Sequence, residues 1–171
     1  MARKTIFITG GASGIGRAVA QRFAQGGWFV GIADIDEAGM AATAALLPAD
    51  HISCHRLDVR DRAAWDTALA DCAASSGGLI DVVFNNAGIP LGGAIIDLTP
   101  EEIERTLDIN MKGVIFGAQA AYPWLKRSGP GSVLLNTASA AGIYGTPGAS
   151  VYSATKFGVR AITESLDGEW A

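Results

Sequence analysis

The sequence reads Thr9-Gly10-Gly11-Ala12-Ser13-Gly14-Ile15-Gly16 at the end of its first apolar run, and this glycine-rich stretch is the strongest indication of the fold. The apolar run is Thr5 to Thr9, and a segment of helical periodicity follows from Gly14 to about Gln25. Glycine in such a loop allows a sharp turn, lets backbone N–H groups approach a pyrophosphate, and lets the helix pack closely on the strand. The spacing therefore predicts a strand, a phosphate-binding loop and a helix. A plain glycine-rich turn of an α/β protein is the alternative.

Apolar runs of strand length alternate with helical segments along the whole chain. The predicted strands are Thr5 to Thr9, Trp28 to Ala33, His51 to Leu57, Ile80 to Phe84 and Ser132 to Asn136. The predicted helices cover about Gly14 to Gln25, Glu37 to Leu46, Ala63 to Ala74, Pro100 to Lys126, and Ser150 onward. Strands separated by helices indicate a parallel sheet with helices on both faces. We therefore expect a doubly wound, Rossmann-like α/β fold that forms a single domain over residues 1–171.

Composition narrows the class of partner. Hydrophobic residues make up 49% and charged residues 18% of the 171 residues, as in ordinary soluble globular proteins. A net charge of −4 provides no basic stripe, so we expect no nucleic acid and no membrane as partner, and a small molecule instead. The apolar run after Arg3 and Lys4 is too short for a secretory signal, which predicts a cytoplasmic protein. Cys54 and Cys72 form no metal-type cluster, so no metal site is expected.

Asp34 follows the second predicted strand, where a dinucleotide-binding fold places the acid that hydrogen-bonds the adenosine ribose. Its carboxylate would repel the 2′-phosphate of NADP, and neither Ile35 nor Ser13 supplies a cation. NAD is therefore the expected cofactor. The alternative is that Asp34 or Asp36 only caps the next helix.

Tyr152 and Lys156 are four positions apart on the last predicted helix, so their side chains share one face. An isolated Y-x-x-x-K pair would most often be an exposed aromatic residue and a solvated lysine. Here the pair comes after the glycine loop and after Ser139, which follows shortly after the fifth predicted strand. This order of motifs indicates a catalytic site.

With these motifs in this order, the chain resembles the short-chain dehydrogenase/reductase superfamily, specifically its short-form subgroup with the motif T-G-x-x-x-G-x-G. Asn85-Asn86-Ala87-Gly88 matches the family's N-N-A-G motif, and Asp58-Val59 matches the acidic position that contacts adenine in relatives. The resemblance implies a catalytic tetrad of Asn110, Ser139, Tyr152 and Lys156. It also implies cofactor contacts from Gly10, Ser13, Gly14, Ile15, Gly16, Asp34, Asp58, Val59, Asn86, Ala87, Gly88, Tyr152 and Lys156.

The implied reaction is the NAD-dependent interconversion of a secondary alcohol and a ketone. A free phenol is a poor base at neutral pH, but Lys156 and the positive charge of oxidised nicotinamide would favour the phenolate of Tyr152, the expected general base. Ser139 would hydrogen-bond the substrate oxygen, and Asn110 would hold a water of a proton relay. Taken singly, Asn110 could be a satisfied buried amide and Ser139 a turn hydroxyl.

Other functions stay open. A noncatalytic NAD-binding fragment or sensor would bind the cofactor without turnover. A sugar-nucleotide epimerase or dehydratase of the longer-form subgroup also uses Y-x-x-x-K, but its glycine motif has a different spacing. A carrier-protein-linked ketoacyl reductase would more often select NADP, so Asp34 counts against it. No substrate is predicted, because the loops Ile89 to Gly93 and Gly142 to Ala149 are mostly apolar or small and suit many alcohols.

The C-terminal end predicts an incomplete domain. The last helical segment reaches Glu169-Trp170-Ala171 without a Gly or Asn cap, and Asp167 and Glu169 stand at its unfavourable negative end. Family members continue with two more strands and a substrate lid, so we expect the final strands to be absent. The resemblance further implies that a full-length chain forms a homodimer or homotetramer through the helices Pro100 to Lys126 and Ser150 onward.

Overall fold

The structure, a computed structural model, describes residues 3–170. The expectation about the chain end at Ala171 therefore lies outside the described residues. The chain divides into two compact units. The sheet unit comprises Met1–Ala87 and Phe116–Leu135, and the helical unit comprises Gly88–Ile115 and Asn136–Ala171.

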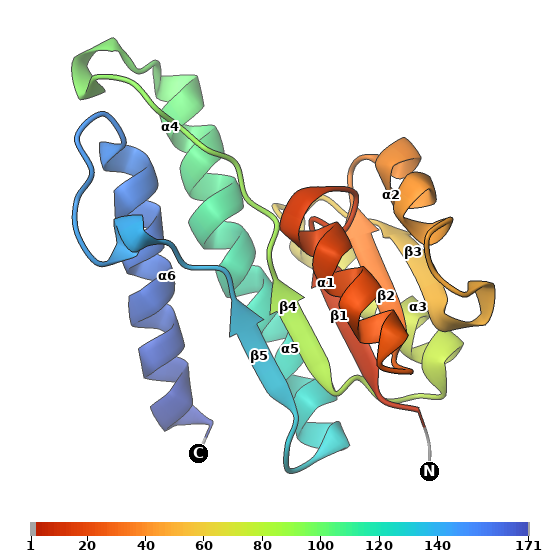
Figure 1. Cartoon of the computed structure of the whole chain (residues 1–171). Coiled ribbons are helices and arrows are strands. Elements are labelled where there is room, and N and C mark those ends of the chain that lie inside the picture. Colours follow the sequence, from red (N-terminus) through yellow and green to blue (C-terminus); the bar gives the residue numbers. More distant parts are fainter. Residues whose placement is uncertain (1–2, 171) are drawn as a thin grey trace. The chain divides into compact units, whose positions relative to one another are not determined.

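A five-stranded sheet forms the centre of the sheet unit (Figure 1). Its strands are β1 (Thr5–Thr9), β2 (Phe29–Asp34), β3 (Ile52–Arg56), β4 (Val82–Asn85) and β5 (Val133–Asn136). They lie in the order β3-β2-β1-β4-β5, and β1 pairs in parallel with both β2 and β4. The strand order reverses between β1 and β4, which is the doubly wound, Rossmann-like arrangement that the alternation of elements predicts. The predicted fold class is confirmed.

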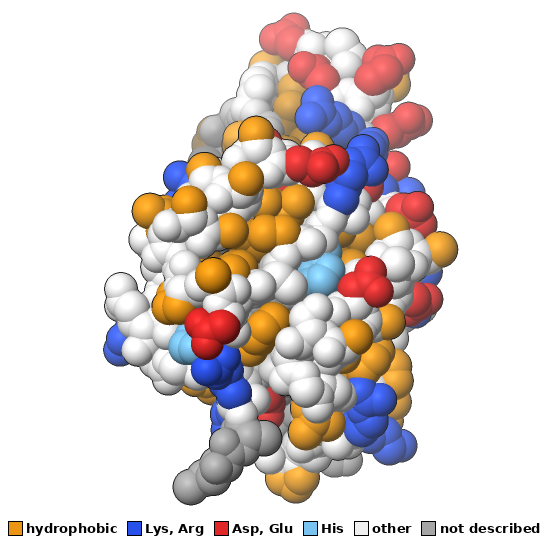
Figure 2. Space-filling view, turned by 90° about the vertical axis from the view of Figure 1, so that its right-hand side faces the viewer, with side chains coloured by type: hydrophobic (Ala, Val, Ile, Leu, Met, Phe, Trp, Pro, Cys, Tyr) orange, Lys and Arg blue, Asp and Glu red, His pale blue; other side chains and the backbone are white. Residues whose placement is uncertain are grey.

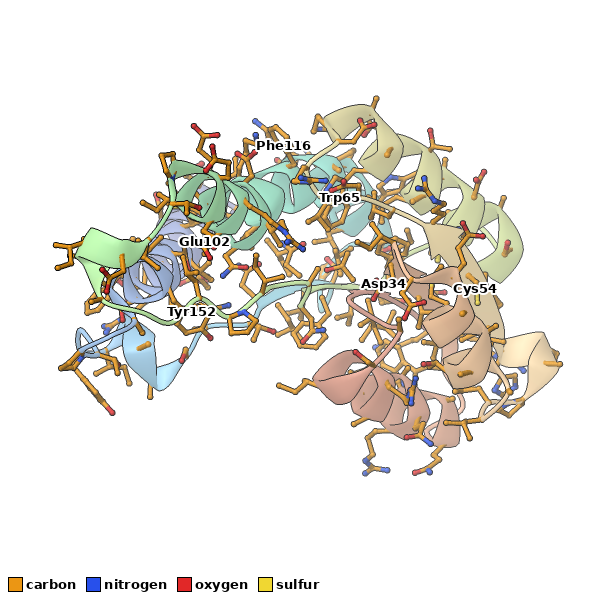
Figure 3. The ribbon with its side chains drawn as sticks, turned by 90° about the horizontal axis from the view of Figure 1, so that it is seen from above. Asp34, Cys54, Trp65, Glu102, Phe116 and Tyr152 are labelled. Carbon is orange, nitrogen blue, oxygen red and sulfur yellow. The ribbon has the colours of Figure 1, made fainter. Side chains whose placement is uncertain are left out.

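Helices cover both faces of this sheet (Figure 3). α1 (Gly14–Gln25) and α2 (Glu37–Ala44) lie on one face, and α3 (Arg62–Ser76) and α5 (Gly113–Ser128) lie on the other. Alternation along β1 explains the two layers, because successive side chains of a strand point to opposite faces. Ile6 and Ile8 join a core cluster with residues of α1 and α2, whereas the ring of Phe7 packs 6.2 Å from that of Trp65 on α3.

α5 approaches β4 closely because residue 117 is glycine. A Cβ at Gly117 would lie 2.1 Å from Oδ1 of Asn85 and 2.8 Å from Cη2 of Trp65. Any side chain there would push α5 away from the strand that ends in the N-N-A-G motif. The close packing thus fixes the position of this motif.

The helical unit contains α4 (Pro100–Leu107) and α6 (Ser150–Glu169). α4 begins at a capping box, in which the hydroxyl of Thr99 accepts the N–H of Glu102 and the carboxylate of Glu102 accepts the N–H of Thr99. Pro100 at the first position suits this start, because its missing N–H would have no helical partner there. No helix within residues 3–170 combines the length and hydrophobicity needed to cross a bilayer.

The predicted helical stretch from Pro100 to Lys126 is present, but it is not α-helical throughout. A π-helical turn, η3 (Asp108–Lys112), separates α4 from α5. Apolar periodicity does not reveal the extra residue of such a wide turn, and π-turns often occur at functional sites. The other predicted elements are present, and none of their ends is shifted by more than two residues. His51, predicted as strand, belongs to a short 3-10 turn, η1 (Ala49–His51).

Candidate active site

The glycine loop needs its glycines for two different reasons. Gly10 and Gly14 adopt left-handed backbone conformations, with φ of +69° and +52°. Gly16 must lack a side chain because a Cβ there would lie 2.1 Å from the carbonyl oxygen of Gly10. At the start of α1 the side chain of Ser13 makes no capping hydrogen bond, and the first turn holds no acidic residue. The first N–H groups of α1 therefore suit an anionic ligand.

Thr9 and Asn86 hold the N-N-A-G motif beside this loop. The hydroxyl of Thr9 accepts the N–H groups of Asn86 and Ala87 at 3.0 Å and 3.1 Å, and the Asn86 amide donates to the carbonyl of Thr9 at 2.9 Å. A Cβ on Gly10 would lie 2.9 Å from the Asn86 amide nitrogen. The motifs were predicted, but the role of the Thr9 hydroxyl was missed. A threonine at the end of a buried strand was the available signal.

The carboxylate of Asp34 contacts the glycine loop at the end of β2. Oδ2 accepts the N–H of Ala12 and Oδ1 accepts the N–H of Asp36, each at 3.1 Å. Asp36 is the residue that caps α2, because its Oδ1 accepts the N–H of Gly39 at 2.9 Å. Of the two acids considered for the cap, Asp36 serves in that role and Asp34 bonds to the loop.

The loop after β3 holds Asp58 and Val59 in fixed positions. Arg60 bonds the Asp58 carboxylate through Nε and Nη2, at 2.9 Å and 2.6 Å, and this hydrogen bonding lowers the pKa of Asp58. Val59 is largely buried, and its carbonyl accepts the indole N–H of Trp65 at 3.1 Å. Asp58 thus remains an anion at neutral pH. Ile15, in contrast, is 62% exposed on the first turn of α1.

In the helical unit, Lys156 is a buried cation. Its Nζ donates to the carbonyl of Thr137 at 2.7 Å and lies 5.7 Å from the centroid of the Tyr152 ring. Burial lowers the pKa of Lys156, because desolvation disfavours the charged form. Tyr152 lies near the loop that carries the 3-10 turn η4 (Ala140–Gly142) in Figure 3. The predicted shared face of Tyr152 and Lys156 is present.

A second tyrosine–lysine pair with the same spacing shows that Lys156 is distinguished by its burial. Tyr122 and Lys126 on α5 also stand four positions apart, with Nζ 5.6 Å from the ring centroid. Lys126 is exposed, whereas Lys156 is buried and bonded to a backbone carbonyl. Spacing alone therefore does not distinguish the two pairs, but burial does.

Asn110 sits in the wide turn η3 and is 1% exposed. Its Oδ1 accepts the N–H of Ile89, and its Nδ2 donates to the carbonyl of Ile89, both at 2.8 Å. Ile89 directly follows the N-N-A-G motif, so the amide fixes the loop that begins there. These bonds agree with the interpretation of Asn110 as a satisfied buried amide. Its part in a proton relay stays a prediction.

Replacing Asn110 with Ala is expected to lower the free energy of unfolding by about 2–6 kcal/mol, because two backbone groups of Ile89 lose their partners at about 1–3 kcal/mol each. Urea unfolding measures this change. Gln119→Ala, which removes an exposed amide from α5, is the control and should change the value by less than about 0.5 kcal/mol. An equally small effect for Asn110→Ala would contradict the prediction.

Ser139 caps η4, since its Oγ accepts the N–H of Ala141 at 3.2 Å. A hydroxyl that accepts one bond keeps its proton for another acceptor. A Cβ at Gly142 would lie 2.7 Å from the carbonyl oxygen of Lys156, so η4 packs tightly on α6. The N–H of Gly93 donates to the carbonyl of Gly148 at 2.8 Å, which joins the two predicted pocket loops.

The predicted site residues fall into two sets. All four tetrad residues lie in the helical unit, as does Gly88, and the other predicted cofactor contacts lie in the sheet unit. Thr137 and Ile89 were not predicted as site residues, because both act through backbone atoms that leave no signal in a sequence. Among residues 3–170, no three His, Cys, Asp or Glu side chains are placed to hold a metal ion.

Comparisons with known proteins agree on one family. Residues 4–171 match the family model described as short chain dehydrogenase. The chain is 37% identical to L-2,3-butanediol dehydrogenase of Corynebacterium glutamicum, over 98% of this chain and 66% of that protein. It therefore spans just under two thirds of that relative's length.

Two solved structures are similar over nearly the whole chain. A short chain dehydrogenase/reductase from Burkholderia phymatum in complex with NAD has a TM-score of 0.91 and 30% identity, over 96% of this chain and 59% of that one. The 3-ketoacyl-(acyl-carrier-protein) reductase from Brucella melitensis complexed with NADH has a TM-score of 0.92 and 33% identity, over 98% of this chain and 70% of that one.

Proposed function

The chain belongs to the short-chain dehydrogenase family, and from this premise we propose that it is an NAD-dependent oxidoreductase that interconverts a secondary alcohol and a ketone. The observation that carries the proposal is the buried Lys156 beside Tyr152, held by the carbonyl of Thr137. Keeping an ammonium group buried is unfavourable, and such groups are concentrated at functional sites. The exposed pair of Tyr122 and Lys126 has no such arrangement.

The sheet unit supplies groups that suit a dinucleotide. The N–H groups at the start of α1 would bind the pyrophosphate, and Asp34 would accept hydrogen bonds from the adenosine ribose. The loop fits such a ligand, because its glycines keep side chains out and no acid stands in the first turn of α1. NAD, when bound, supplies the acceptor of the hydride that leaves the alcohol carbon, and NADH supplies its donor.

The helical unit supplies the proton chemistry. Tyr152 takes the alcohol proton at its phenolic oxygen during oxidation and returns a proton during reduction. The positive charge of Lys156 favours the phenolate, and its hydrogen bond to Thr137 holds the charge in place. Ser139 accepts the N–H of Ala141, which leaves the hydroxyl proton of Ser139 for the substrate oxygen. Both groups would thus act on one oxygen atom of the alcohol or ketone.

The proposal is tested by mixing the protein with NAD and a panel of secondary alcohols while following the absorbance of reduced nicotinamide. Titration of NADH fluorescence measures binding in parallel. Turnover of at least one alcohol, together with NADH binding, is expected. Binding without turnover over the whole panel would favour a noncatalytic NAD-binding protein. Absence of NADH binding would contradict the proposal as a whole.

Asp34 should set the preference for NAD. Replacing Asp34 with Asn removes the charge but keeps one acceptor for the N–H of Ala12. We expect the ratio of the Kd for NADPH to the Kd for NADH to fall about tenfold, because a hydrogen bond to a charged group contributes about 1.5–3 kcal/mol. Fluorescence titration of both cofactors measures this ratio. Asp36→Asn, at the cap of α2, is the control and should leave the ratio unchanged. If Asp34→Asn also left the ratio of the two Kd values unchanged, Asp34 would not be the residue that selects NAD.

Assembly and location remain part of the proposal. We expect a homodimer or homotetramer in the cytoplasm. Ile115 and Phe157 support an interface, since both expose apolar side chains in the helical unit, at 38% and 42%. Light scattering after size-exclusion chromatography measures the oligomeric state.

A further inference from the structure

Arg56 stands beside the acid that is expected to select the ribose. It ends β3 and is the register partner of Asp34 on β2. Register partners on neighbouring parallel strands lie about 5 Å apart, and their side chains point to the same face of the sheet. Nε of Arg56 lies 3.2 Å from Oε1 of Glu37, the first residue of α2. A cation is thus present next to Asp34, and an acid of α2 holds it.

We propose that Glu37 is a specificity-determining residue that keeps Arg56 from binding a 2′-phosphate, so that Asp34, Glu37 and Arg56 together form a latent NADP site. This inference rests on the proposed function, because it assumes a dinucleotide whose adenosine ribose meets Asp34. It adds a second determinant to the cofactor preference. Asp34 repels the 2′-phosphate directly. Glu37 forms an ion pair with the guanidinium of Arg56, which would otherwise bind the phosphate.

Arg56 is better suited to this role than the two nearby arginines. Arg17 donates to the hydroxyl of Thr43 at 2.9 Å and to the carbonyl of Ala12. Arg60 is bonded to both carboxylate oxygens of Asp58. Those two guanidinium groups hold the glycine loop and the loop after β3, so moving either one would disturb its loop.

The pair of Arg56 and Glu37 is weak enough to exchange partners. Their side chains are 71% and 70% exposed, and an exposed ion pair contributes about 0–1 kcal/mol. A guanidinium binds phosphate through two parallel, charge-assisted hydrogen bonds, which are stronger. The side of the molecule formed by α2, β3 and α3 faces the viewer in Figure 2, where basic and acidic side chains lie close together. Once the acids are neutralised, a phosphate dianion should therefore capture Arg56.

The negative charges of both Asp34 and Glu37 have to be removed before Arg56 can bind the 2′-phosphate of NADPH. In Asp34→Asn alone, Glu37 still holds Arg56 and adds its own repulsion to a phosphate. In the double variant Asp34→Asn/Glu37→Gln, Arg56 is released. The start of α2 stays capped, because Asp36 accepts the N–H of Gly39. Asp36 also keeps its negative charge near the site, which limits the expected gain.

The experiment compares Kd values for NADPH and NADH in Asp34→Asn, in Asp34→Asn/Glu37→Gln, and in that double variant with Arg56→Met added. Calorimetry with 2′,5′-adenosine diphosphate and with 5′-AMP tests the phosphate site without the nicotinamide half. The control is a triple variant in which Arg22→Met, rather than Arg56→Met, is added to Asp34→Asn/Glu37→Gln. Arg22 carries the same charge but lies in the last turn of α1, away from the glycine loop.

Glu37→Gln in the Asp34→Asn background should tighten NADPH and 2′,5′-adenosine diphosphate about tenfold, and should leave NADH and 5′-AMP within about threefold. Arg56→Met should abolish this gain, and Arg22→Met should preserve it. The inference would be overturned if the double variant bound NADPH no more tightly than Asp34→Asn does. It would also be overturned if the tighter binding persisted after Arg56→Met, or if Arg22→Met abolished it to the same extent. If the wild-type protein binds neither NADH nor 5′-AMP, the proposed function fails together with the inference; if it binds both, the two are judged separately.

Discussion

Replacing Tyr152 with Phe lowers kcat by about 10³-fold and leaves the Kd for NADH within about threefold, since general acid–base groups contribute about 10²–10⁴-fold. The change removes one oxygen atom and its proton. The ring itself stays, and with it the contact to Lys156, whose Nζ lies 5.7 Å from the centroid. A loss of turnover without a loss of NADH binding therefore isolates the proton-transfer step.

Tyr122→Phe is the matched control for this variant. Tyr122 has the same spacing to its lysine and nearly the same distance, 5.6 Å, but its lysine is exposed. Steady-state kinetics with an alcohol found in the panel should show wild-type kcat for Tyr122→Phe. If Tyr152→Phe kept more than about a tenth of the wild-type kcat, the phenol would not be the proton-transfer group.

Replacing Lys156 with Met lowers kcat for alcohol oxidation by about 10²-fold at neutral pH, and activity recovers in part as the pH is raised. The reason is electrostatic, because the phenolate loses the neighbouring cation that favours it. The pH profile of kcat measures this. Lys126→Met, which removes the exposed lysine of the matched pair, should leave the profile unchanged. Full activity of Lys156→Met at every pH would refute the electrostatic account.

In contrast to its large effect on kcat, Lys156→Met should have only a small effect on stability. Burial lowers the pKa of Lys156, so the folded protein binds this proton less readily than the unfolded chain, in which the pKa is near 10.5. The cost of burying the charge is therefore fully present below the lowered pKa and fades as the pH rises toward 10.5. Methionine removes this cost. We expect the free energy of unfolding of Lys156→Met at neutral pH to fall by no more than about 1 kcal/mol, although the carbonyl of Thr137 loses one donor. A larger loss, measured by urea unfolding, would indicate that Lys156 is mainly structural.

The elements that follow local rules could be predicted from the sequence. β1, the glycine loop and α1 have the predicted bounds, because left-handed turns and apolar periodicity depend on a few neighbouring residues. The parallel sheet followed from the alternation of strands and helices, since parallel strands need crossover connections that are usually helical. The family, too, could be read from motifs, each of which is a short local pattern.

The burial and the partners of the individual residues in these patterns depend on the three-dimensional fold. Lys156 and Lys126 share one spacing, and residues distant in the sequence bury the first and leave the second exposed. The π-turn that contains Asn110 was missed because apolar periodicity does not reveal its extra residue. The partner of the Asn110 amide was missed because it is the backbone of Ile89, and a backbone partner has no sequence signature. Arg56 lies beside Asp34 because β2 and β3 align in register, and Glu37 at the start of α2 forms an ion pair with Arg56. Burial and partner choice depend on contacts between distant segments, whereas turns and periodicity are encoded within a few consecutive residues.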